Sequence, residues 1–180
     1  MVKLQAKGDI YIMKKVLQFS GLIALVLAVV AFILMMATNA IVQTSGSVQV
    51  VTAGTTAIFG KDETLLGVTV HTNPSVLALI GWILLLVGML IVIVGVILPL
   101  LKVTALEKFA GLLNLVAVVC LVLAGVFMFI VVPTFFGAND ANVPDNAAIG
   151  AGWVIGGILA IAAGVFAILP AAAAFLGKKK

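Results

Sequence analysis

The chain has 180 residues, of which 64% are hydrophobic and 9% carry a charge. Soluble globular domains contain about 25% charged residues, so this composition excludes an ordinary soluble fold and indicates an integral membrane protein. The formal net charge is +4, and all ten basic residues are lysine, which disfavours a dedicated site for bidentate recognition of phosphate or carboxylate. Cys120 is the only cysteine, so an intrachain disulfide is excluded.

The N-terminal part predicts a basic leader followed by a first membrane span. Residues 1–15 are expected to be a flexible cytoplasmic leader, because so short a segment has no stable helix of its own. The span is predicted over residues 16–42, where the run Phe19–Ala37 carries no charge and matches the ~20 residues that cross a bilayer. A cleaved secretory signal is the competing interpretation, since lysines precede the run and Thr38–Ala40 has the small residues of a cleavage site. Signal sequences, however, have apolar cores of only about 7–15 residues.

Residues 43–75 form the only long polar segment, and they predict a small antiparallel β element. Valines alternate with polar residues over Val48–Thr52, which is the period of a half-buried strand. Two further strands are predicted at Thr55–Phe59 and Thr64–Val70, with Gly60–Glu63 as the turn between them. The expected structure is therefore a three-stranded meander between the first two spans.

Three further apolar runs predict spans two to four. Asn73 is expected to cap the second span, with Pro74 at the first helical position, and Thr104–Glu107 fits a capping box before the third span. The remaining divisions are a span over 76–101, a cytoplasmic loop over 102–108, a span over 109–133, an outer loop over 134–146, a span over 147–176 and a lysine tail over 177–180.

The lysines predict the orientation of the chain. With both chain ends in the cytoplasm, nine lysines lie on the inner side and Lys61 alone lies outside, a distribution that the positive-inside rule strongly favours. Trp82 and Trp153 then both fall at the outer interface, where they are expected to anchor the helices. The predicted location is the cell membrane, with several spans and the lipid bilayer as a partner. Anionic lipid heads account for the inner lysines, so no nucleic-acid partner is expected.

Two pairs of segments resemble each other. Gly81–Pro99 and Gly152–Pro170 both begin with Gly-Trp and end with Leu-Pro at equal length, and Phe19–Val26 resembles Phe109–Val116. Apolar segments built from few residue types also match by chance, so duplication and coincidence both stay open. The predicted fold is an all-α membrane protein, a four-transmembrane-helix bundle with an extracytoplasmic antiparallel β element in its first outer loop. A true duplication would make it two tandem helical hairpins.

Small residues recur at intervals of seven in the predicted spans, which places them on one face of each helix. Helices approach closely in lipid through such residues. Two interpretations are open, because the faces either pack within one bundle or contact another copy, and neither favours a wide pore through one chain. The predicted helix-packing glycines are Gly81, Gly88, Gly95, Gly150, Gly157 and Gly164.

The predicted spans contain no Asp, Glu, Lys, Arg or His. This disfavours an ion-coupled transporter, because such proteins use ionisable groups within the membrane. Asn114 is the one amide deep in a span, and it is expected to make a polar contact between helices or, alternatively, to line a solute path. His71 is the only histidine, which excludes a multi-histidine metal site. No catalytic residue, cofactor or metal site is therefore predicted, and an enzyme is not expected.

Four spans, a larger first outer loop with a strand pattern and a small second loop resemble the claudin-type tetraspan plan. The tryptophan motif and the cysteine pair of that family's first outer loop are missing between Gln43 and Ser75, so the resemblance transfers no residue roles. The expected function is a non-catalytic scaffold or accessory subunit whose outer loop, Ser47–Val70, contacts a protein partner or another copy. The alternative is an oligomeric channel or permease subunit for a neutral or lipidic solute.

Overall fold

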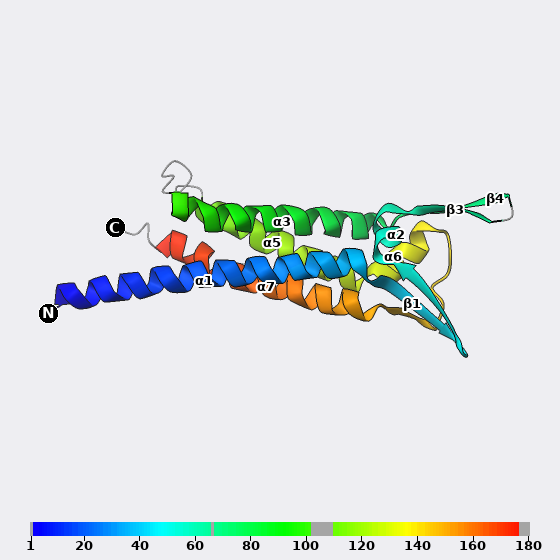
Figure 1. Cartoon of the computed structure of the whole chain (residues 1–180), viewed down its shortest axis with the longest axis horizontal. Helices are drawn as coiled ribbons and strands as arrows, with labels where there is room; N and C mark the ends of the chain where they lie inside the picture. The colour runs from blue at the N-terminus through cyan, green and yellow to red at the C-terminus, as the bar shows by residue number, and fades with distance from the viewer. Residues whose placement is uncertain (1, 66, 102–109, 177–180) are drawn as a thin grey trace.

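A computed structural model describes residues 2–65, 67–101 and 110–176 (Figure 1). Four of its helices are long and apolar enough to cross a membrane. They are α1 (Val2–Ala37), α3 (Val76–Leu101), α5 (Ala110–Phe129) and α7 (Ala151–Leu176). The helices run side by side along the long axis of the molecule, and the strands gather at one end (Figure 1). The prediction of a mainly helical chain with four apolar helices and a small antiparallel β element is confirmed.

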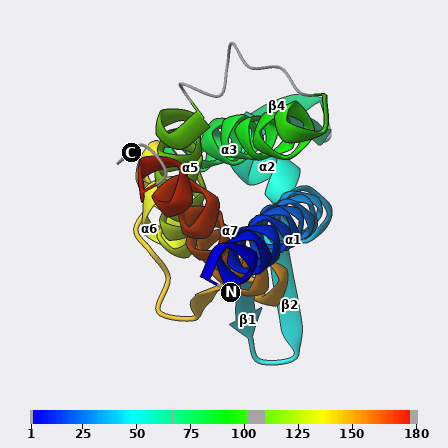
Figure 2. The same cartoon turned by 90° about the vertical axis from the view of Figure 1, so that its left-hand side faces the viewer.

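The four long helices form a ring in which each packs against the next in the chain and α7 returns to α1 (Figure 2). The contact between α5 and α7 is the most extensive, and the contact between α1 and α3 is the least extensive of the four. The two predicted hairpins are therefore not packed equivalently, since the helices of the first touch far less than those of the second. Duplication of the sequence stays a prediction, but the packing departs from two-fold symmetry.

Most side chains in the apolar segments of these helices are partly buried or exposed. The share of buried residues in those segments is only 28 to 39%. Large hydrophobic side chains such as Val26, Ile33, Leu112 and Ile158 are about half exposed. An apolar surface of this extent is unfavourable in water, so the bundle surface is suited to lipid.

Strands at one end of the bundle form two separate antiparallel units. The first is a sheet in the order β2-β1-β5, made of β2 (Val48–Ala53), β1 (Asn39–Ser45) and β5 (Ala147–Ile149). The second is the hairpin of β3 (Lys61–Leu65) and β4 (Val68–Thr72). Both the β1–β2 hairpin and the β3–β4 hairpin project away from the helices (Figure 1). This part of the molecule, with its two short helices described below, is called the strand-bearing end.

The predicted strand at Thr55–Phe59 and the predicted turn at Gly60–Glu63 are wrong. Residues Gly54–Phe59 form the short helix α2, in which Ala57 and Ile58 are fully buried. Burial of this turn of helix against α1 and α3 overrides the strand preference of its β-branched residues. Lys61 to Glu63 then lie within β3, and the chain reverses at Gly67, whose φ of 82° suits glycine.

Several element boundaries differ from those predicted. Helix α1 begins at Val2, so the predicted leader is helical and continuous with the first span. That helix ends at Ala37, and the apolar residues up to Val42 belong to β1, because Ala40 and Ile41 are buried against protein. The predicted capping box at 104–107 lies outside the described residues.

The chain after α5 also departs from the predicted division. The short helix α6 (Val131–Ala138) continues past Pro133, where the third span was expected to end. Residues 147–149, expected to start the fourth span, form β5 instead. Asn73 does not cap the second span. Ser75 precedes α3 directly, and its hydroxyl accepts a hydrogen bond from the amide of Ala78 at 3.3 Å, which makes Ser75 the cap.

Candidate functional site at the strand-bearing end

Backbone contacts fix the sheet to the ends of α1 and α7. The amide of Gly150 donates to the carbonyl of Ala40 at 2.9 Å, and the amide of Gly54 donates to the carbonyl of Thr38 at 2.8 Å. Neither glycine has room for a side chain, because a Cβ at Gly54 would collide with the Met35 carbonyl and one at Gly150 with the Asn39 carbonyl. These close approaches leave no space between the sheet and the helix ends at the two glycines.

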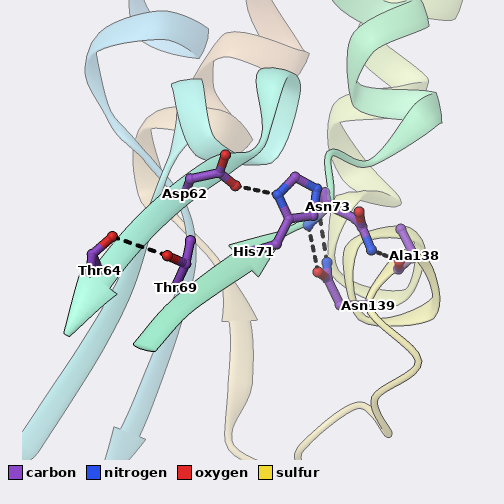
Figure 3. Close-up of polar contacts among 7 residues, drawn as sticks. All are labelled: Asp62, Thr64, Thr69, His71, Asn73, Ala138 and Asn139. Atoms are coloured by element: carbon purple, nitrogen blue, oxygen red, sulfur yellow. Dashed lines mark hydrogen bonds and ion pairs between the residues drawn. The ribbon is translucent and has the colours of Figure 1, made fainter. Parts of the chain in front are cut away.

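Two asparagines join the first and second loops of the strand-bearing end (Figure 3). The Asn139 side chain accepts from the amide of Asn73 at 2.7 Å and donates to the carbonyl of Asn73 at 3.0 Å. The Asn73 side chain donates in turn to the carbonyl of Ala138 at 3.1 Å. The Asn139 side chain also donates to the carbonyl of Phe135 in α6 at 2.9 Å. The segment before α3 is thereby tied to the end of α6.

A second polar link lies deeper between the same segments. The hydroxyls of Ser75 and Thr134 are 2.8 Å apart, and Ser75 is fully buried. Thr134 also donates back to the carbonyls of Ile130 and Val131, each at 3.0 Å. Because buried polar groups are costly when unpaired, this satisfied pair positions α6 against the start of α3.

The β3–β4 hairpin carries charges in an exposed cluster. His71 Nδ1 contacts Asp62 Oδ1 across the two strands, and Lys61 pairs with Glu63. The hydroxyls of Thr64 and Thr69 are 3.3 Å apart on the same hairpin (Figure 3). The four ion-pair side chains are each more than half exposed, and the threonine contact also lies at the surface. Exposed ion pairs of this kind contribute little stability. Among the described residues, no group of three or more His, Cys, Asp or Glu side chains is arranged to hold a metal ion.

The β1–β2 hairpin differs sharply from this charged hairpin. Residues 39–53 contain no charged side chain. Strand β2 lies at the edge of the sheet, and three of its valines are exposed, Val48 by 62%, Val50 by 57% and Val51 by 48%. Neighbouring residues of a strand point to opposite faces, so Val50 and Val51 leave both faces of the edge apolar. The result is an exposed, uncharged strand with free backbone groups along one side.

The two tryptophans occupy different surroundings. Trp153 is fully buried, and its indole Nε1 donates to the carbonyl of Met35 in α1 at 3.1 Å. Trp82 is partly buried and packs against Phe32 and Phe59, with ring centroids 6.2 and 5.2 Å away. Anchoring at a membrane interface stays a prediction for both residues. The structure adds that the Trp153 ring contacts only protein.

The predicted glycine faces meet helices of the same chain. A Cβ at Gly81, Gly88 or Gly95 of α3 would lie within 3.2 Å of a side-chain atom of α5. On α7, Gly157 faces Phe129 and Gly164 faces Val122, both on α5. Gly150, which directly precedes α7, contacts β1. The glycines of α3 and α7 thus pack against α5 from two sides. Gly125 of α5, which the spacing of seven did not identify, meets the Gly157 carbonyl.

Asn114 lies between α3 and α5. It is 9% exposed, and its Oδ1 is 2.7 Å from the position of a Cβ at Gly95. The amide therefore fits against α3 only because residue 95 has no side chain. Cys120 is buried in the same interface, beside Gly88.

Residues outside the sequence predictions build much of this end of the molecule. Asn139, Thr134 and Ser75 form the links between loops, but each is a common polar residue near a helix end and carries no motif. Their pairing over more than fifty positions appears only in the folded chain. Comparison of the chain with models of known protein families and with curated proteins gave no match.

Proposed function

We propose that the chain is a non-catalytic membrane scaffold or accessory subunit that binds another protein through the exposed edge of β2. The observation that carries this proposal is the uncharged edge strand with exposed Val48, Val50 and Val51. Proteins normally protect such edges with charges, prolines or short length, because a free edge recruits a further strand. An extended segment of a partner would gain backbone hydrogen bonds along β2 and bury its valines.

The geometry of a membrane favours a different protein over a second copy at this edge. Two copies inserted in the same direction are related by a rotation about the membrane normal. Such a rotation does not change how far a strand points up or down along the normal. Strand β2 runs obliquely to the long axis of the bundle (Figure 1). The β2 strands of the two copies would therefore point in the same sense along the membrane normal. Antiparallel edge pairing needs opposite directions, which such a pair does not provide.

Site-specific photo-crosslinking in native membranes tests this interface. A photo-reactive residue in place of Val51 is expected to give one discrete adduct, whereas the same residue in place of Val70 on the other hairpin gives none. Val70 is a matched control because it is 52% exposed, close to the 48% of Val51. Val50→Lys should reduce the Val51 adduct about tenfold, since a lysine on an edge strand opposes pairing. Equal adducts from both positions, or an adduct that Val50→Lys leaves unchanged, would contradict the proposal.

We further propose that the strand-bearing end lies outside the cell and that both chain ends are cytoplasmic. The start of α1 and the end of α7 lie at the opposite end of the bundle (Figure 1), and Lys61 is the only lysine of the sequence in the strand-bearing end. A membrane-impermeant amine reagent applied to intact cells should label the protein once, and Lys61→Gln should remove the label. Labelling that survives this substitution would reverse the orientation.

The transport alternative lacks a specific observation in its favour. Five of the six predicted packing glycines meet α5 of the same chain and Gly150 meets β1, so these faces are not left for contacts around a shared solute path. Asn114, the other candidate for such a path, fits against Gly95 between α3 and α5. Both features are accounted for by close helix packing. A scaffold is therefore the better-supported function.

A further inference from the structure

The tryptophans of the two Gly-Trp pairs differ in their hydrogen bonding, because only one of the two indole N–H groups has an acceptor in the part of the chain that the structure describes. Trp153 Nε1 donates to the Met35 carbonyl. Trp82 Nε1 is buried, and among the described residues it has no hydrogen-bond acceptor. A buried tryptophan normally finds an acceptor, and leaving a buried donor unpaired costs about 1–3 kcal/mol. The N–H of Trp82 therefore needs an explanation that packing alone does not give.

The position of Trp82 points to the seam between α1 and α3. Its ring packs against Phe32 of α1 and, edge-on, against Phe59 at the end of α2. This seam is the least extensive of the four contacts between neighbouring long helices. It is consequently the seam where a bound molecule would displace the fewest contacts between neighbouring long helices.

The residues around Trp82 determine which class of ligand could bind in the α1–α3 seam. The segments Phe19–Ala37 and Val76–Gly95, which line it, contain no ionisable residue, so a charged ligand group would be left unpaired there. Aromatic and aliphatic side chains favour an apolar body, and the indole N–H supplies one donor. We propose that the α1–α3 seam binds an apolar molecule with an uncharged carbonyl oxygen, which accepts a hydrogen bond from Trp82 Nε1.

Such a carbonyl has two sources in a membrane, the ester of a phospholipid and a free lipid-soluble ketone or quinone. Because the chain has only two tryptophans, its ¹⁵N-labelled form has two indole N–H resonances. Trp82→Phe identifies the Trp82 resonance, and the Trp153 resonance serves as an internal control for folding. The full chain is placed in nanodiscs of ester-linked phosphatidylcholine, of the ether-linked analogue, and of the ether-linked analogue with an isoprenoid quinone added.

A Trp82 resonance that moves downfield in ester lipid but not in ether lipid assigns the carbonyl to the phospholipid. One that moves only when quinone is added assigns it to a free ligand. In either case Trp82→Phe should lower retention of that ligand about fivefold, the equivalent of one neutral hydrogen bond, while Trp153 stays unshifted. The proposal is overturned if the Trp82 resonance is the same in all three membranes. Exchange of its proton with one bound water in every membrane would also overturn it, because water is then the acceptor.

Discussion

Gly125→Leu is expected to destroy the folded bundle. A Cβ at this position would lie 2.6 Å from the carbonyl oxygen of Gly157 and 3.2 Å from the backbone nitrogen of Ile161. Both atoms belong to the backbone of α7, so no side-chain rotation relieves the collision and the whole helix has to move. Overpacking in cores that can adjust costs about 1–3 kcal/mol, and we expect a larger cost here. Thermal unfolding in detergent should lose its cooperative transition.

Gly137→Leu is the matched control for this change. Gly137 lies in α6, where a Cβ would meet no atom within 4 Å. The same substitution there should leave the unfolding midpoint almost unchanged. An intact transition in Gly125→Leu would mean that the backbones of α5 and α7 do not touch at this crossing. Gly88→Leu is expected to fall between the two, because its Cβ meets the side chain of Leu121 at 2.9 Å and not a backbone atom.

Trp153→Ala should produce the second large loss of stability. The ring is fully buried, and it links α7 to the Met35 carbonyl near the end of α1. Replacing a buried tryptophan by alanine costs about 3–5 kcal/mol through the lost contacts and the remaining cavity. The measurement is the free energy of unfolding in a denaturing detergent series, and the expected result is a shift of the midpoint to much lower denaturant.

Two further variants separate the causes of that loss. Trp153→Phe keeps most of the ring but removes the hydrogen bond, so it should cost about 1–3 kcal/mol. Ile155→Ala truncates a side chain of the same helix that is 51% exposed, and it should cost little in a micelle. If Ile155→Ala proved as damaging as Trp153→Ala, the face of α7 assigned to the core would be wrong.

The helical part of the fold could be predicted from the sequence because each residue of an apolar run adds to the evidence for a membrane-spanning helix. Each span is a long run without charge, and length alone identifies it. The glycine spacing also located two faces of close packing, on α3 and α7. It missed Gly125, because valines stand seven residues to either side of it. The role of Gly125 becomes visible only from the helix that crosses it.

The strand-bearing end could not be read in the same way, because its structure depends on partners far along the chain. Ala40 and Ile41 are apolar residues that the fold buries against protein. In the sequence they follow the first apolar run, so they were predicted to belong to the first span. Residues 54–59 have strand-like composition, but burial between α1 and α3 makes them helical. Residues Ala147–Ile149 are too few to show a period, and only pairing with β1 makes them a strand.

The pairing of β1 with β5 also sets when this end of the molecule can form. Strand β1 follows the first long helix, whereas β5 directly precedes the last. During synthesis β1 and β2 exist only as a two-stranded hairpin, which is marginally stable in water, until residues 147–149 emerge. The stable sheet is thus a late product of biogenesis, in keeping with the slow closure of distant contacts. A partner that requires this sheet would meet it only on chains synthesised through the last loop.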